Sequence, residues 1–177
     1  MHPCRLPYVL LLVGLVTSAR AVAQTPSCPA SLAARYAALR GTWSLVQESK
    51  PIGKVVVTTE AGGCLGHETE ILGGDTTGIT VGFYDRPSDQ WLSTYVGADG
   101  TLLRLAGGWQ TSDRLVLEGP GYDGAKKGQP IPHRATLIRI HPDTLRQIIE
   151  IVRDSGRGWE VGYDARWIRD KAASSPP

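Results

Sequence analysis

Residues 90–105, QWLSTYVGADGTLLRL, contain two short segments with alternating side chains on either side of a turn. Residues 90–96 and 101–105 are the alternating segments, and Asp99-Gly100 supplies the turn. A period of two places successive side chains on opposite faces of a β-strand, and a short turn joins antiparallel neighbours. This stretch therefore predicts a pair of antiparallel strands.

The same pattern continues in both directions from this pair, with turn residues between the segments. Further strands are expected at 43–46, 54–59, 64–72, 78–84, 114–117, 134–140, 145–152 and 159–168. About ten short strands with short connections predict an all-β sandwich or barrel. A meander of this size removes its edges by closing, which favours a single antiparallel up-and-down barrel. The one long connection, 119–132, is expected to be a mobile loop at a rim.

One short N-terminal helix is expected before the strands, over residues 28–40. Ser27 suits the cap position and Pro29 the first turn, and Leu32, Tyr36 and Leu39 recur at helical spacing. A helix this short is marginal in isolation, so it should pack on the barrel.

The first 23 residues have the features of a secretory signal peptide. Arg5 precedes an apolar run at 6–16, and Ala21-Val22-Ala23 gives the small-x-small pattern of a cleavage site. A membrane anchor is the alternative, but the run is shorter than the roughly 20 residues that span a bilayer. Neither Cys4 nor Cys28 has the residues that precede a lipoprotein cysteine.

These features predict three segments and a compartment. We expect a signal peptide at 1–23, a barrel domain at 24–170 and a disordered polar tail at 171–177. The protein should be periplasmic or secreted, without a membrane anchor.

The charge balance is close to neutral. The chain has 19 Lys+Arg and 17 Asp+Glu residues, a formal net charge of +2, and loss of residues 1–23 removes Arg5 and Arg20. Nucleic-acid binding needs a basic excess on one face, which this composition does not provide. We therefore expect a monomer that binds no nucleic acid.

The cysteines point to an oxidised protein. Of the 3 cysteines, Cys4 leaves with the signal peptide, while Cys28 and Cys64 remain. Two cysteines in an exported protein predict one disulfide, with two buried free thiols as the alternative. They are too few for a structural zinc site.

Gly41-Thr42-Trp43, after the expected helix, resembles the Gly-x-Trp opening of the calycin superfamily, which includes the lipocalins. Further residues match, in order, a family of uncharacterised bacterial proteins with a lipocalin-like barrel: Gly63, Cys64, Glu68, Gly78, Tyr84, Asp85, Trp91, Gly100, Leu117, Gly119, Arg134, Thr136, Arg146, Gln147, Glu150, Asp154, Gly156, Trp159 and Asp164. The resemblance implies a lipocalin-like barrel. The chain departs from the family at Thr80, Ser93, Tyr95, Leu137, Ile149 and Trp167, and we expect these positions to line a cavity.

A barrel of about ten strands is wider than one of eight, whose side chains can nearly fill it. A cavity for a small amphiphilic or hydrophobic molecule would have apolar walls and a few polar groups. The candidate ligand-binding residues are Trp43, Glu68, Thr80, Tyr84, Trp91, Tyr95, Arg134, Gln147 and Glu150, with Leu137 and Ile149 as further walls. The alternative is that the aromatic side chains fill the barrel.

Arg134 and Glu150 lie on two segments joined by the turn at Pro142-Asp143. If Thr136 lies opposite Glu150, Arg134 and Glu150 are diagonal neighbours on one face. The pattern leaves open whether that face is the interior or the solvent side, and a slip of one residue would separate the pair.

Metal binding and serine catalysis have little support. His67, His133 and His141 lie in separate segments, and alternation points His67 away from Glu68 and Glu70. The serines lack the sequence context of a catalytic triad, and the Gly-x-Trp-x-Gly-x-Gly opening of a related haem-binding family is missing. We predict no metal, no catalytic residue and no cofactor.

Three functions remain. An exported protein that binds a small, partly apolar molecule is favoured. A barrel enzyme that uses Glu68 and Glu150 as acid and base, with Arg134, is the second. A structural or interaction barrel with a filled core is the third.

Overall fold

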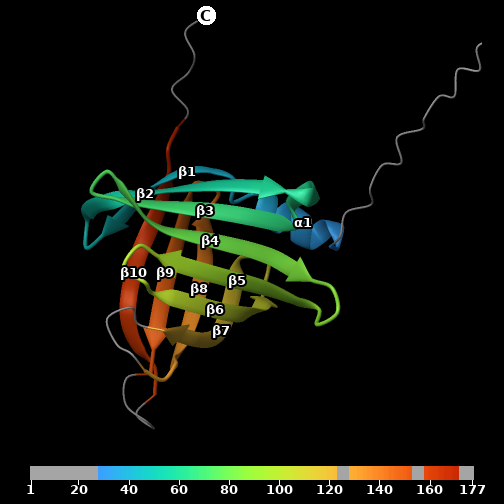
Figure 1. Ribbon diagram of the computed structural model, residues 1–177. Helices are drawn as coiled ribbons and strands as arrows, with labels where there is room; N and C mark the ends of the chain where they lie inside the picture. The colour runs from blue at the N-terminus through green and yellow to red at the C-terminus, as the bar shows by residue number, and fades with distance from the viewer. Residues whose placement is uncertain (1–27, 123–127, 153–157, 172–177) are drawn as a thin grey trace, which may run out of the picture.

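The computed structural model describes residues 28–122, 128–152 and 158–171. The expected signal peptide and nearly all of the expected tail lie outside these residues. The described chain forms a closed antiparallel barrel of ten strands preceded by one α-helix, which confirms the predicted fold class (Figure 1).

The elements follow one another along the chain with short connections. They are α1 (Ala30–Ala37), β1 (Gly41–Gln47), β2 (Lys50–Glu60), η1 (Ala61–Gly63), β3 (Leu65–Leu72), β4 (Asp75–Asp85), β5 (Gln90–Gly97), β6 (Leu102–Trp109), β7 (Arg114–Tyr122), β8 (Ile131–His141), β9 (Thr144–Ile151) and β10 (Glu160–Arg169).

Each strand pairs with the next in sequence, and β10 closes the barrel by pairing with β1. Trp43 lies opposite Arg169 across this closing pair, and Val46 lies opposite Arg166. Figure 1 shows β1–β4 crossing β8–β10 steeply, as the tilt of strands in a barrel requires. The meander that the alternation predicts is therefore complete and has no free edge among the described strands.

The helix closes one end of the barrel. Tyr36 and Leu39 are almost completely buried there, and the Tyr36 ring stacks on Trp91 with a centroid distance of 4.4 Å. The indole Nε1 of Trp43 donates a hydrogen bond to the Leu39 carbonyl over 2.8 Å. The expectation that the short helix packs on the barrel is thus confirmed.

Arg169 ties the last strand to the segment after the helix. Its guanidinium lies 4.0 Å over the Trp43 ring and donates to the Ala38 and Arg40 carbonyls over 2.8 and 2.6 Å. Gly41 makes room for this contact, because a Cβ there would come within 2.8 Å of Arg169 Nη1. The two carbonyls that follow α1 are therefore hydrogen-bonded by a side chain of β10.

The helix is shorter than expected at both ends. It begins at Ala30 with Pro29 as its N-cap residue, and no side chain caps it. The expected cap, Ser27, lies outside the described residues. At the other end, hydrogen bonds from Leu39 and Arg40 to the Tyr36 and Ala37 carbonyls form tighter turns after Ala37.

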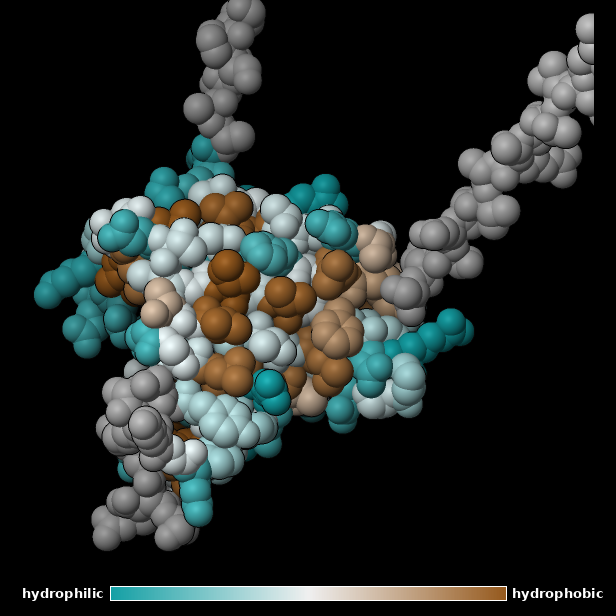
Figure 2. Space-filling model, in the orientation of Figure 1, coloured by the Kyte–Doolittle hydropathy of each residue, from teal (hydrophilic) through white to brown (hydrophobic). Residues whose placement is uncertain are grey.

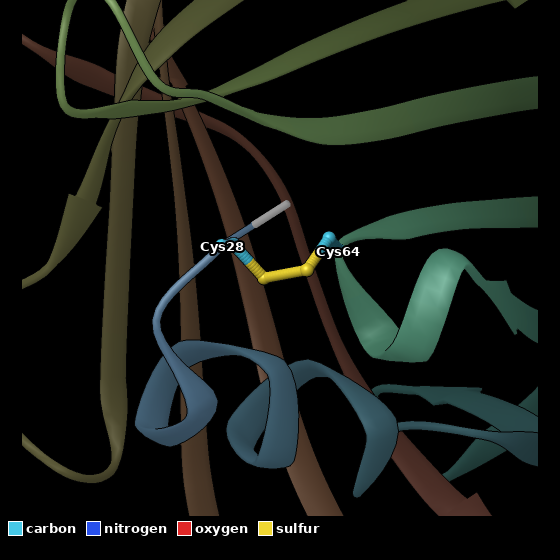
Figure 3. The surroundings of a disulfide bond; sticks show 2 residues. All are labelled: Cys28 and Cys64. Atoms are coloured by element: carbon cyan, nitrogen blue, oxygen red, sulfur yellow. A yellow bond between two sulfur atoms is a disulfide. The ribbon is translucent and has the colours of Figure 1, made fainter. Parts of the chain in front are cut away.

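Cys28 and Cys64 form the predicted disulfide, with a Cα–Cα distance of 5.6 Å. Figure 3 shows the bond joining the chain just before α1 to the chain between η1 and β3. Both cysteines are buried beside Ala33. The bond therefore fixes the helix to the end of the barrel that it closes.

The two ends of the expected long loop at 119–132 are strand, and residues 123–127 lie outside the described residues. β7 runs to Tyr122 and β8 starts at Ile131, with Gly119 opposite His133. A Cβ on Gly119 would come within 2.1 Å of the Arg104 carbonyl oxygen. Gly119 therefore marks close backbone approach inside a sheet rather than a turn, which is why the loop prediction was wrong in its bounds.

Part of the outer wall is apolar. Ile79, Val81 and Phe83 of β4 are each about 40% exposed, and Val96 of β5 is 52% exposed. Figure 2 shows hydrophobic side chains gathered in the middle of the face formed by β3, β4 and β5. Among the described residues, no helix has the length and hydropathy needed to cross a membrane.

Candidate functional site

The barrel contains a cavity of about 460 Å³. Its walls come from α1 and from strands around the barrel, and they reach from Trp91 and Tyr36 at the closed end to His133 and Ile151 at the other. Fully buried side chains gather at the α1 end, whereas Glu70, Leu72 and Tyr95 are only half-buried. The cavity is thus closed by α1 and faces the opposite rim.

Two tyrosine rings lie flat against the wall, which keeps the cavity open. A Cβ on Gly66 would come within 1.7 Å of the Tyr36 ring, and one on Gly78 within 2.3 Å of the Tyr95 ring. Because glycine has no side chain, each ring can pack directly against the backbone of the sheet at these inward positions. Large aromatic residues therefore contribute surface here without filling the interior.

The carboxyl of Glu68 lies in the cavity wall beside Tyr36. The Tyr36 hydroxyl donates to its Oε1 over 3.1 Å. Glu68 lies inside the barrel, so its remaining accessible surface faces the cavity. Burial, opposed by the Tyr36 hydrogen bond, raises the Glu68 pKa to about 7, and it also raises the Tyr36 pKa well above its ordinary value.

Glu70 lies two residues further along β3 and faces the same way. Its Oε1 accepts hydrogen bonds from Thr77 Oγ1 over 2.9 Å and from the Tyr95 hydroxyl over 3.3 Å. Burial and the neighbouring Glu70 raise the pKa of Tyr95 to about 12, and the same causes raise the pKa of Tyr163. The Tyr163 hydroxyl is buried and has no hydrogen-bond partner in the described part of the chain.

Most of the remaining wall is apolar. Leu103, Leu105, Leu117 and Ile149 contribute aliphatic surface. His133 is the one lining residue that can carry positive charge, and its Nδ1 lies 2.8 Å from the Ile131 carbonyl. The described lining thus combines an apolar body with an acidic, tyrosine-rich corner.

The cavity brings together five of the nine predicted ligand-binding residues, namely Glu68, Thr80, Trp91, Tyr95 and Gln147. The positions at which the chain departs from the resembled family also line it: Thr80, Ser93, Tyr95, Leu137, Ile149 and Trp167. Alternation along each strand placed these side chains on the inner face.

Trp43 and Tyr84 lie elsewhere. Trp43 is fully buried below the cavity, tilted against Trp167 with a centroid distance of 6.4 Å. Tyr84 packs beside the disulfide and donates a hydrogen bond to Asp89. Both stand at the α1 end, where the helix and the aromatic residues leave no room for a ligand.

Arg134 and Glu150 are on the outer face of the barrel. They lie directly opposite each other rather than diagonally. The turn pairs His141 with Thr144, and a bulge between Arg139 and His141 then shifts the register of β8 against β9 by one more residue. Arg134 Nε lies 2.6 Å from Glu118 Oε1, and its Nη1 lies 3.7 Å from Glu150 Oε2. The guanidinium also covers the Trp159 ring at 4.2 Å. This pair is therefore a solvent-side ion pair and not a polar group of the cavity.

Four titratable lining residues were absent from the predicted set: Tyr36, Glu70, His133 and Tyr163. Glu70 carried a usable signal, since it follows Glu68 at strand spacing. Tyr163 follows a register shift between Val161 and Tyr163, which alternation alone does not reveal. Tyr36 enters from the helix, and no strand pattern could place it.

The chain was compared with models of known protein families and with curated proteins, and neither comparison gives a match.

Proposed function

We propose that this barrel is an exported, calycin-type protein that binds a small, partly apolar molecule in its cavity. The observation that carries the proposal is the cavity of about 460 Å³, with aliphatic walls and polar groups gathered at one side. Small-molecule sites typically have volumes of roughly 300–1,000 Å³ and this distribution of polar groups.

Two further features support the proposal. The interior is not filled by its aromatic residues, so a structural barrel with a packed core explains less of the molecule. The Cys28–Cys64 disulfide favours a periplasmic or secreted location, where such bonds persist.

The test is a fluorescence titration with N-phenyl-1-naphthylamine, an uncharged probe that brightens in apolar surroundings. The protein should bind one probe molecule per chain. Ser93→Trp should abolish binding, because Ser93 lines the cavity. Thr94→Trp is the matched control, because alternation points Thr94 outward on the same strand.

Loss of binding in Ser93→Trp alone supports the cavity as the site. Equal binding by both variants would place the probe on the outer wall, and absence of binding by the unmodified protein would count against a ligand-binding barrel.

A second candidate function, a barrel enzyme, is favoured by one observation. Glu68, held by Tyr36, has a pKa of about 7, which suits a general acid or base at neutral pH. Its expected partner Glu150 lies outside the cavity, so Tyr36 is the residue left to work with it. Glu68→Gln would then retain ligand yet stop its conversion, whereas for a binding protein the bound molecule is recovered unchanged.

A further inference from the structure

The charged groups of the cavity are of one sign apart from His133. Glu68 and Glu70 both face the interior, and the described lining contains neither lysine nor arginine. Arg134 and Arg146 lie on the outer face of the barrel. Arg134 pairs there with Glu118 and Glu150, and Arg146 pairs with Asp164. Carboxylates that are partly removed from water and have no cation beside them are destabilised, so a cationic guest would stabilise this corner.

The hydrogen bonds made by Glu68 and Glu70 leave acceptor positions free on both carboxyls. Tyr36 donates to Glu68 Oε1, while Thr77 and Tyr95 donate to Glu70 Oε1. No described residue donates to the Oε2 atom of either carboxyl. The Tyr36 and Tyr95 hydroxyls have given their hydrogens to the carboxyls and can only accept from a guest, whereas the Tyr163 hydroxyl still has a hydrogen to donate.

A guest that matches this corner must bring N–H donors and positive charge. An ammonium group has three donors and no acceptor. A carboxylate or phosphate would instead meet carboxyl groups, which repel it when they are ionised. The stacked Tyr36 and Trp91 rings and the Tyr95 ring add aromatic faces, which attract cations as well as apolar groups.

We propose that the ligand is an organic amine, whose ammonium group lies against Glu68 and Glu70 while its alkyl or aryl body lies along Leu103, Leu117 and Ile149. This inference rests on the proposed function and narrows it to one class of molecule. Glu68 and Glu70 are then specificity-determining residues. Tyr36 and Tyr95 orient the two carboxyls.

The affinity for an amine should depend on pH. Besides Glu68, the titratable groups that line the cavity are Tyr36 from α1, Glu70 from β3, Tyr95 from β5, His133 from β8 and Tyr163 from β10. The Glu68 carboxyl, with a pKa of about 7, loses its proton between pH 6 and pH 8 in the empty protein. Amine affinity should therefore rise over this interval, while the affinity for an uncharged molecule of the same size should stay level.

The experiment displaces N-phenyl-1-naphthylamine with three eight-carbon molecules that differ only in the head group: octylamine, octan-1-ol and octanoate. At pH 8 octylamine should bind at least roughly tenfold more tightly than octan-1-ol, as expected for a charged hydrogen bond, and octanoate should bind most weakly. Glu70→Gln and Glu68→Gln should each reduce the preference for the amine by roughly tenfold and leave octan-1-ol within about twofold.

Glu150→Gln is the matched control, since it removes a carboxyl of the outer face and should not change the preference. Both cavity substitutions keep the size of the side chain, and either one alone decides the question if the other fails to fold.

Equal affinity for octylamine and octan-1-ol, or tighter binding of octanoate, would overturn the amine proposal while probe binding still upholds the cavity. A preference for the amine that Glu150→Gln abolishes, and the cavity variants do not, would also overturn it. If neither the probe nor any of the three molecules binds, the amine proposal and the proposed function fall together.

Discussion

The two ends of this barrel are built from the same ten strands and are packed in different ways. At the α1 end, Trp43, Leu145 and Trp167 are buried to within 2% of completely and fill the interior. Toward the other end, Glu70 and Tyr95 stand around open space and are only half-buried.

Side-chain size and glycine placement account for this difference. Large residues point into the barrel at the closed end, whereas in the open half Gly78 lets the Tyr95 ring lie against the wall. The closed end has the packing that stabilises the fold, and the open half has the polar groups and space that a ligand needs. Substitutions at the two ends should therefore have separable effects.

The largest difference in stability between the two ends should appear when Trp43 is replaced. Trp43→Ala removes a fully buried indole, its hydrogen bond to Leu39 and its contact with Arg169. The free energy of unfolding, measured in urea, should fall by roughly 3–5 kcal/mol. Tyr95→Phe in the open half is the comparison, and the loss of its single hydrogen bond should cost about 1 kcal/mol. Similar losses for the two variants would break the contrast between the ends.

Removal of the disulfide should weaken the closed end by nearly as much. Cys28 and Cys64 are 36 residues apart, and a loop of that length corresponds to roughly 3–4 kcal/mol in the chain-entropy model. Cys28→Ala with Cys64→Ala should lower the midpoint of urea unfolding accordingly and leave the cavity walls in place. Two reactive thiols in the denatured, exported protein would show instead that the bond does not form.

In the open half, Glu68 should make the stability of the fold depend on pH. Because the folded-state pKa of Glu68 is raised from 4.5 to about 7, the folded protein holds this proton more tightly than the unfolded chain. Its contribution to stability is complete below pH 4.5 and is lost as the pH rises through 7, on the order of 3 kcal/mol in all.

Glu68→Gln should therefore flatten the decline in stability between pH 5 and pH 8 measured by urea unfolding. A variant that keeps the full slope would place the responsible proton on another group.

The smallest effect is expected at the outer ion pair. Arg134 is 28% exposed and Glu150 24%, and they meet at 3.7 Å on the solvent side of the wall. A double-mutant cycle with Arg134→Met and Glu150→Leu should give a coupling energy of at most about 1 kcal/mol. A coupling of roughly 3 kcal/mol or more would indicate a desolvated pair and would contradict its outer position.

Sequence alone predicted the barrel because alternation and short turns act locally. The strand positions, and the shared face of residues two apart on a strand, follow from patterns within a few residues. The Cys28–Cys64 bond follows instead from the number of cysteines that remain after the signal peptide. The positions that depart from the resembled family proved to be cavity walls, since each keeps its face whatever side chain it carries.

The errors came from features that are not local. The bulge beside Ile140 changed the partner of Arg134, and the shift at Val161 brought Tyr163 inward. Tyr36 reaches the site from a helix held by a distant cysteine. Trp43 matched the apolar character of a cavity wall but belongs to the filled end, and the pattern of a single strand does not distinguish the two ends of a barrel.

Native mass spectrometry of the purified protein tests the central claim most directly, namely that the open half holds a small guest. The account predicts one bound small molecule per chain, either retained through purification or taken up from added octylamine. The Thr94→Trp variant should carry the same guest, and Ser93→Trp, which fills the cavity, should carry none. Bare protein mass under every condition, or the same guest on both variants, would contradict the claim.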